Sequence, residues 1–162
     1  MLKDAEIGAD CNIGECCYIE NNVKVGNEVV IKNGVSLWSG LTVEDRVFIG
    51  PNVSFTNDRI PRAKVLHEHY EETLIREGAS IGANATILCG ITLGSWCLIG
   101  AGSVVTHDVP DFGLAYGNPA QLLGWICKCG IRIPLTVEGN GQTKCTCGAV
   151  YILSDGKLRR QS

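Results

Sequence analysis

The chain has 162 residues, with 14 Lys or Arg, 17 Asp or Glu and a net charge of −3 at pH 7. This length suits one main domain with a small appendage. The scattered basic residues argue against a nucleic-acid-binding protein, and no apolar run is long enough for a transmembrane helix. The N-terminal residues Met1–Asp4 are followed directly by repeat sequence and do not resemble a signal peptide. Nine cysteines in such a chain predict a reducing, cytoplasmic location.

A large apolar side chain recurs every six residues through most of the chain. A smaller residue usually follows it four positions later, as Cys11 and Ala85 do. A period of six fits neither an α-helix nor a long alternating strand, and is typical of hexapeptide repeats. Three hexads would close one coil, so nine hexads and then six predict about five coils of an all-β, parallel β-helix over residues 1–112. The register positions are Ile7, Ile13, Ile19, Val25, Ile31, Leu37, Val43, Ile49, Phe55, Ile75, Ile81, Ile87, Leu93, Ile99 and Val105.

Glycine often follows the large apolar residue directly, as in Ile49-Gly50 and Ile81-Gly82. We expect these glycines at the corners of the coils because glycine and asparagine tolerate dihedral angles that β-branched residues resist. The repeat cysteines have no His or Lys close in sequence that would activate a thiol, so they are expected to be structural. They are Cys11, Cys16, Cys17, Cys89 and Cys97.

A polar segment interrupts the repeat at residues 56–74. Ile75 follows Phe55 by 20 residues, which is not a multiple of six, and Arg59 stands where a small inward residue is expected. Long ordered excursions from a rigid scaffold often carry binding groups, although a plain surface loop is the alternative. His67 and His69 lie in this excursion and could act as a base if it folds over a cleft, but a solvated polar run is favoured.

Pro110 ends the ladder, and residues 113–124 are expected to form a turn-rich cap. Residues 125–162 contain two Cys-x-Cys-Gly corners, which predict a zinc-ribbon-like tail holding a structural zinc ion. The one-residue spacer is tighter than the usual two to four, but a tail of this length could scarcely hold a core without a metal. Four thiolates leave no open position for catalysis. The expected metal ligands are Cys127, Cys129, Cys145 and Cys147.

Two blocks are more specific than the hexads: Phe55–Asp58 with Pro61-Arg62, and Gly82–Ile87. The segments Val43–Ser54, Gly100–Thr106 and Gly117–Ala120 continue the same match. Over about residues 7–130 the chain resembles the hexapeptide acyltransferases, in particular those that acetylate the 3-amino group of nucleotide-linked 3-amino-3-deoxy sugars. The resemblance implies a left-handed β-helix, acetyl-CoA as co-substrate, a UDP- or dTDP-linked amino sugar as acceptor in cell-surface polysaccharide precursor synthesis, and a homotrimer with sites between subunits. The chain departs from that family by starting about one coil later and by having His107 where Lys is usual.

The resemblance also implies roles for individual residues. Asn84 would orient the sugar amine, although a corner asparagine in the left-handed conformation is an equally good interpretation of its register. Asn57, Asp58 and Arg62 would contact the sugar or its diphosphate, with Arg62 as a solvated loop charge the alternative. Coenzyme A would lie against Ala101, Gly102, Ser103, Asn118, Pro119 and Ala120.

The histidines help to rank the competing functions. An amine needs less help from a base than a hydroxyl does, and no histidine is expected on a coil face, which favours N-acetylation over O-acetylation. A γ-class carbonic anhydrase would need three histidines from adjacent coils, which this chain does not provide. A non-catalytic β-helix scaffold is the alternative from another functional class.

Overall fold

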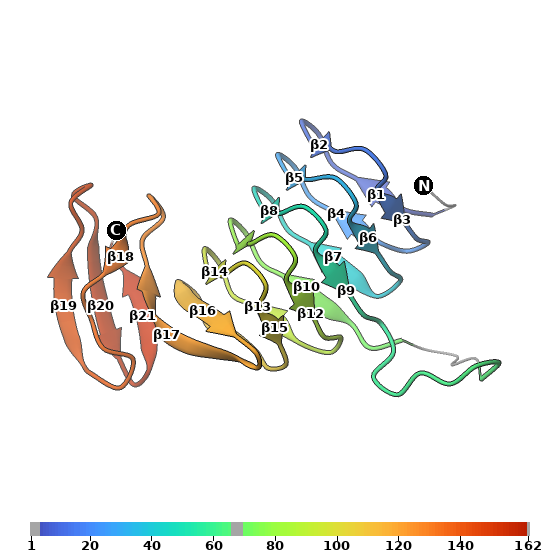
Figure 1. Cartoon of the computed structure of the whole chain (residues 1–162). Helices are drawn as coiled ribbons and strands as arrows, with labels where there is room; N and C mark the ends of the chain where they lie inside the picture. The colour runs from blue at the N-terminus through green and yellow to red at the C-terminus, as the bar shows by residue number, and fades with distance from the viewer. Residues whose placement is uncertain (1–3, 66–69, 162) are drawn as a thin grey trace.

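A computed structural model describes residues 4–65 and 70–161, and all regular elements in these ranges are β-strands. Figure 1 shows short strands stacked into a prism, with a small sheet at its C-terminal end. No helix in the described residues is long and apolar enough to cross a membrane.

Three parallel sheets form the walls of the prism, here called faces 1, 2 and 3. Face 1 contains β1 (Glu6–Ile7), β4 (Lys24–Val25), β7 (Leu41–Val43), β10 (Thr73–Ile75) and β13 (Thr92–Leu93). Face 2 contains β2 (Asn12–Ile13), β5 (Val30–Ile31), β8 (Phe48–Ile49), β11 (Ser80–Ile81) and β14 (Leu98–Ile99). Face 3 contains β3 (Tyr18–Ile19), β6 (Ser36–Leu37), β9 (Ser54–Phe55), β12 (Thr86–Ile87) and β15 (Val104–Val105).

Each strand pairs with the strand three positions later in sequence, so three hexads close one coil, as predicted. Five coils are complete. An incomplete sixth begins at Val109, which bridges to Leu93, and continues in β16 (Gly113–Gly117), which pairs with β14. The parallel β-helix is therefore confirmed, and its left-handed winding stays a prediction from the resemblance.

The register residues fill the interior of the prism. Ile31, Leu37, Ile49, Ile81 and Ile99 are each fully buried. Burial of such a side chain stabilises the fold by about 1.5–3 kcal/mol relative to exposure. The first coil has a neighbouring coil on one side only, so its inward-facing Ile13 is 37% exposed.

The corners differ from the prediction in one respect. A positive φ recurs every six residues, but three positions after the large apolar residue rather than directly after it, as at Asn52 (φ 56°) and Asn84 (φ 56°). The glycines directly after that residue have no positive φ. A Cβ on Gly50 would lie 2.7 Å from the Ala83 nitrogen, and one on Gly82 would lie 2.5 Å from the Ala101 nitrogen. The dihedral explanation was therefore wrong for these glycines, which are needed because neighbouring coils approach so closely.

The excursion leaves after β9 and returns in β10, on the next coil. In Figure 1 it projects from the side of the prism. The small inward position expected at Arg59 is taken by Thr73, which is 4% exposed and pairs with Leu41. The Thr73 hydroxyl accepts a hydrogen bond from the Gly90 backbone at 3.2 Å, which satisfies this polar group at the core boundary.

Residues 113–124, expected to be a turn-rich cap, instead form most of a β-hairpin. β16 pairs antiparallel with β17 (Ala120–Ile126), and β18 (Arg132–Ile133) adds to β17, so this hairpin extends face 2. The hairpin forms because the last complete coil leaves β14 with a free edge, to which β16 adds.

The tail forms a separate antiparallel sheet of β19 (Gly141–Lys144), β20 (Val150–Ser154) and β21 (Lys157–Arg160). It has a small core of its own, in which Trp125 and Tyr151 are fully buried. Phe112 at the end of the prism belongs to this second core and stacks edge-on against Tyr151 at 5.4 Å between ring centroids. The tail is thus packed onto the last coil.

Candidate functional site

The edge between faces 2 and 3, here called the 2/3 edge, carries most of the predicted site. Asn84 lies above Asn52 on this edge, since its backbone N–H donates to the Pro51 carbonyl at 2.9 Å. Gly102 lies one coil higher, because its N–H donates to Ala83 at 2.8 Å. Gly117 follows, with its N–H donating to the Ser103 hydroxyl at 3.2 Å. The structure therefore brings Asn84 and the predicted coenzyme A contacts together on successive levels of one edge.

Asn84 satisfies both interpretations of its position. Its φ of 56° is the left-handed conformation expected of a corner asparagine. Its side chain is exposed, and the structure gives the amide no hydrogen-bond partner within residues 4–65 and 70–161. An amide both donates and accepts hydrogen bonds, so it is available to a ligand on this edge.

The predicted coenzyme A contacts divide into accessible and internal groups. Ala101 and Gly102 are exposed, and no protein atom lies within 4 Å of the place where a Gly102 side chain would begin. The Ser103 hydroxyl is buried and donates to the Gly100 carbonyl at 2.7 Å, so it fixes the corner. Asn118 and Pro119 are exposed, whereas Ala120 is half-buried against the core.

The predicted sugar contacts lie near the edge between faces 3 and 1, at the start of the excursion. Asn57 and Asp58 are half-buried, and the Asp58 carboxylate accepts a hydrogen bond from the Ile60 N–H at 2.9 Å. Arg62 is exposed and donates to the Pro61 carbonyl at 3.0 Å. His67 and His69 lie outside the described residues.

Arg59 ties the excursion to the prism, a function that the sequence did not suggest. Its guanidinium donates to the Glu71 carboxylate and to the Cys89 carbonyl, both at 3.0 Å. The Cys89 N–H in turn donates to the Thr56 hydroxyl at 2.9 Å. Both ends of the excursion are therefore attached to the corner at Cys89, through partners 12 to 33 residues apart that no local pattern connects.

Within one chain, these two groups of residues are not brought together. Asn84 lies on the 2/3 edge, whereas Asn57, Asp58 and Arg62 lie beyond the opposite end of face 3. The two groups are therefore separated by the width of face 3.

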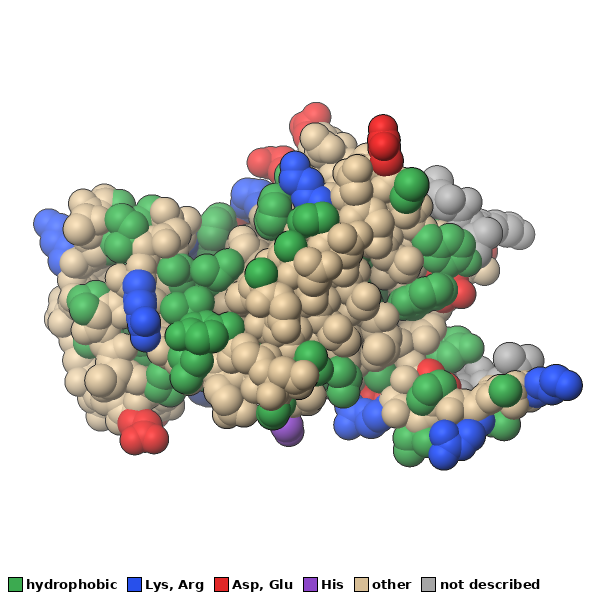
Figure 2. Space-filling model, in the orientation of Figure 1, with side chains coloured by type: hydrophobic (Ala, Val, Ile, Leu, Met, Phe, Trp, Pro, Cys, Tyr) green, Lys and Arg blue, Asp and Glu red, His purple; other side chains and the backbone are tan. Residues whose placement is uncertain are grey.

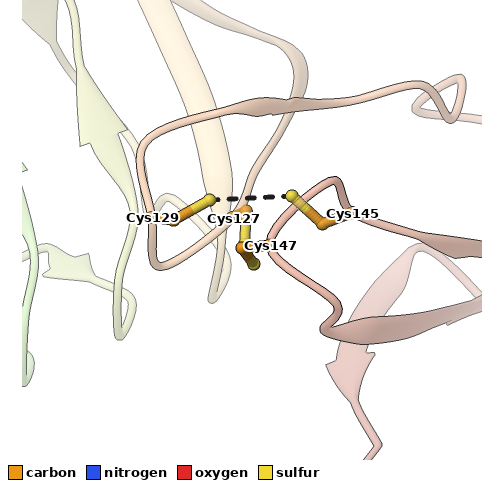
Figure 3. A group of neighbouring side chains, drawn as sticks. All are labelled: Cys127, Cys129, Cys145 and Cys147. Atoms are coloured by element: carbon orange, nitrogen blue, oxygen red, sulfur yellow. Dashed lines mark hydrogen bonds between the residues drawn. The ribbon is translucent and has the colours of Figure 1, made fainter.

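The four tail cysteines form a compact thiol cluster, shown in Figure 3. Their sulfur atoms all lie within 4.8 Å of one another. Cys127 lies 3.5 Å from Cys147, and Cys129 lies 3.6 Å from Cys145. Four sulfurs around a tetrahedral zinc ion with Zn–S bonds of about 2.3 Å are about 3.8 Å apart, so the donor set and its spacing fit zinc.

The two Cys-x-Cys-Gly turns have the same backbone geometry. The Gly130 N–H donates to the Cys127 carbonyl and the Gly148 N–H to the Cys145 carbonyl, both at 2.8 Å. Both glycines have positive φ, 84° and 94°. The turns are therefore built alike and present their thiols toward a common centre.

Hydrogen bonds prepare one of these thiols for ionisation. Burial opposes ionisation of Cys127, but hydrogen bonds from the Cys129 backbone, the Tyr151 hydroxyl and the neighbouring thiols outweigh it and lower the Cys127 pKa to about 6. Tyr151 donates to the Cys127 sulfur at 3.2 Å and accepts from the Lys128 N–H at 3.3 Å. Such outer hydrogen bonds orient metal ligands, and the thiolate is the ligand form of cysteine.

Two segments of the chain match known families of hexapeptide repeats. Residues 72–107 match the family model of the bacterial transferase hexapeptide (six repeats), and residues 5–38 match that of the hexapeptide repeat of succinyl-transferase. Residues 5–38 and 72–107 are therefore hexapeptide repeats. The match to residues 5–38 covers the first two coils, and the match to residues 72–107 covers the two coils after the excursion, which include Asn84 and Gly102.

Similar proteins are acetyltransferases. The chain is 47% identical over 89 residues to the dTDP-3-amino-3,6-dideoxy-α-D-galactopyranose 3-N-acetyltransferase of Aneurinibacillus thermoaerophilus. That match covers 55% of this chain and 45% of the relative, so less than half of the relative's length is spanned.

Two solved structures share the fold at 26% identity. A hexapeptide-repeat acetyltransferase from Vibrio cholerae, complexed with acetyl-CoA, has a TM-score of 0.66 over 74% of this chain and 70% of its own. A maltose O-acetyltransferase from Clostridium difficile 630 has a TM-score of 0.68 over 76% and 71%. The resemblance to hexapeptide-repeat acetyltransferases is thus confirmed in both sequence and fold.

Proposed function

We propose that the chain is an acetyl-CoA-dependent N-acetyltransferase acting on the 3-amino group of a nucleotide-linked 3-amino-3-deoxy sugar, a step in cell-surface polysaccharide precursor synthesis. The observation that carries this proposal is the 47% identity to an enzyme named for that reaction. Because that relative acts on a dTDP-linked sugar, a dTDP-3-amino-3,6-dideoxyhexose is the first acceptor to test, and a UDP-linked amino sugar is the second.

The reaction requires an unprotonated amine next to the acetyl thioester. The amine nitrogen attacks the acetyl carbon, the carbon–sulfur bond breaks, and coenzyme A leaves as a thiol after it receives the proton released by the amine. A side-chain amide at Asn84 can accept a hydrogen bond from the amine and donate one to the sugar, which fixes the angle of attack. The exposed backbone at Ala101 and Gly102 leaves room for the pantetheine arm to approach the same edge.

A homotrimer with shared sites is part of this proposal. The residues assigned to the sugar and the residues assigned to coenzyme A lie at opposite ends of face 3. In a closed ring of three chains, the excursion of one subunit can face the 2/3 edge of the next. Basic side chains are distributed along the excursion, where Figure 2 shows Lys and Arg on the projecting segment, and they would attract a sugar-linked diphosphate.

Transfer from acetyl-CoA, followed as thiol release, tests the reaction directly. The two amino sugars are assayed in parallel with the hydroxyl analogue of each. Turnover of an amino sugar but not of its hydroxyl analogue is the expected result. Turnover of the hydroxyl analogue would favour the O-acetyltransferase alternative, and failure to bind acetyl-CoA would favour a non-catalytic scaffold.

Replacing Asn84 with Gly separates its two interpretations. Glycine keeps the left-handed corner, so we expect an unchanged fold and a loss of about 100-fold in kcat, the scale on which removal of one positioned hydrogen-bonding group usually acts. Asn52→Gly removes the same side chain from the same edge, one coil below, at the same φ of 56°, and should stay within twofold of the original rate. Equal activity of both variants would make Asn84 a corner residue only.

Arg59→Gln tests whether the excursion must be anchored. Loss of the hydrogen bonds to Glu71 and Cys89 should raise KM for the amino sugar about fivefold and leave KM for acetyl-CoA within twofold, because an exposed ion pair of this kind is worth up to about 1 kcal/mol. Arg46→Gln breaks a comparable exposed ion pair with Glu77 on another edge and serves as the control. A similar KM change in the control variant would contradict an anchoring role.

We also propose that the thiol cluster holds a structural zinc ion and that the protein is cytoplasmic. The bound metal would join the two turns of the tail and supply no open coordination position. No disulfide joins the nine cysteines, all of which lie within residues 4–65 and 70–161, and this supports a reducing compartment.

A further inference from the structure

A groove separates the tail from the edge between faces 1 and 2. It consists of two adjoining cavities of about 600 and 380 Å³, which share Asp111, Leu158 and Arg159. Asn84 and Gly102 lie on a different edge of the prism, and the excursion lies on the third. The groove therefore belongs to neither of the sites described above, and we call it the tail groove.

The floor of the tail groove is a fixed aromatic ring. Trp96 lies on this edge, and its indole covers Gly78 of the coil below, where a side chain would collide with the ring. The Lys128 ammonium lies 4.2 Å from the centroid of the indole. Lys128 stands between Cys127 and Cys129 in the first turn of the thiol cluster. The cation–π contact thus links that turn to the prism and holds one positive charge at the groove.

The charges that line the tail groove do not balance. Its carboxylates already have partners, Glu77 with Arg46 at 2.5 Å and Asp111 with Arg76 at 3.2 Å. Four other cations line it without a carboxylate in ion-pair contact, as far as residues 4–65 and 70–161 show: Lys128, Lys157, Arg159 and Arg160. The chain as a whole has a net charge of −3, so this concentration of positive charge is local. Such a cleft raises the local concentration of anions.

We propose that the tail groove binds the diphosphate group of a phosphorylated ligand. Adjacent arginines suit this group because each guanidinium can bind two phosphate oxygens, and Arg159 lines both cavities. A volume of about 600 Å³ is within the usual range for a small-molecule site. A bound diphosphate would be held from one side by β21 and from the other by Lys128, next to the Trp96 indole of the prism.

Titration calorimetry of the full chain with inorganic pyrophosphate at low ionic strength tests the proposal. We expect saturable binding of one pyrophosphate per chain, weakened at least tenfold by Arg159→Gln and less by Arg159→Lys, which keeps the charge but loses the paired donors. Lys32→Gln removes one exposed positive charge elsewhere on the prism and should leave the affinity within twofold. Thermal unfolding and metal content, measured on the same samples, verify that each variant keeps its fold.

Two further titrations identify the source of the diphosphate. If coenzyme A displaces pyrophosphate and UDP does not, the diphosphate belongs to the co-substrate. If UDP displaces it and coenzyme A does not, the diphosphate belongs to a nucleotide. Displacement by neither would indicate a separate phosphorylated ligand, with the groove still a diphosphate site. Absence of pyrophosphate binding, or equal binding by Arg159→Gln and Lys32→Gln, would overturn the proposal whether or not the protein acetylates amino sugars.

Discussion

Cys145→Ser is expected to abolish metal retention and to unfold the tail while the coils remain folded. Cys145 is buried at 6% exposure among three other thiols, and a serine hydroxyl is a poor replacement for a zinc-bound thiolate. The tail is about as short as domains that need a metal to fold, and zinc binding in such units supplies about 10–16 kcal/mol of apparent free energy. Loss of one ligand should therefore remove most of the stability of the tail.

Two measurements follow this change. Metal analysis should fall from about one zinc ion per chain to nearly none, and the fluorescence of Trp125, fully buried in the second core, should shift as the indole meets water. Cys16→Ser changes an exposed thiol at a corner of the prism and should alter neither quantity. A variant at Cys145 that keeps Trp125 buried without metal would show that the tail core is stable by itself.

Gly82→Ala is expected to destabilise the β-helix by about 3 kcal/mol, at the upper end of overpacking effects. The added methyl group would lie 2.5 Å from the Ala101 nitrogen and 2.8 Å from the Gly100 carbonyl carbon. The Gly100 and Gly102 N–H groups on either side donate between coils, to the Ala115 and Ala83 carbonyls, so this peptide unit cannot move without disturbing the ladder. In a chain of this size, the melting temperature should fall by roughly 6–12 °C.

Gly102→Ala provides the matched control for this prediction. Gly102 has a positive φ of 68° but open space around its missing side chain. Alanine there should cost about 1–2 kcal/mol, because only the left-handed conformation opposes it. Equal destabilisation by the two substitutions, measured by thermal unfolding, would mean that backbone conformation and not close coil contact selects both glycines.

The sequence predicted the prism well because every hexad meets the same physical requirement. A residue such as Ile49 or Ile81 must point inward at each turn of the chain, so a single period specifies the fold. The thiol cluster was equally predictable, since two Cys-x-Cys-Gly turns bring four ligands to one centre. Asn84 was predictable as a corner residue from its register, whereas its catalytic assignment came from the resemblance alone.

Contacts between distant segments were not predictable in the same way. Arg59 looked like a break in the repeat, but it anchors the excursion through Glu71 and Cys89. Thr73 was not recognised as the inward residue that begins the fourth coil, because the insertion before it hid the register. The glycines after each large apolar residue were placed at corners for the wrong reason, because a dihedral preference can be inferred from one residue and a clash with the next coil cannot.

The sequence by itself therefore determined the period, the number of coils, the position of the interruption and the identity of the thiol cluster, because each depends on residues at fixed local spacing. Only the tertiary structure decided which residues share an edge. It placed Asn84 below Gly102, separated both from the excursion, and set Lys128 over Trp96 beside Arg159. The physical reason is that a six-residue period states how often the chain turns, whereas the stacking of the coils and the docking of the tail decide which distant residues meet.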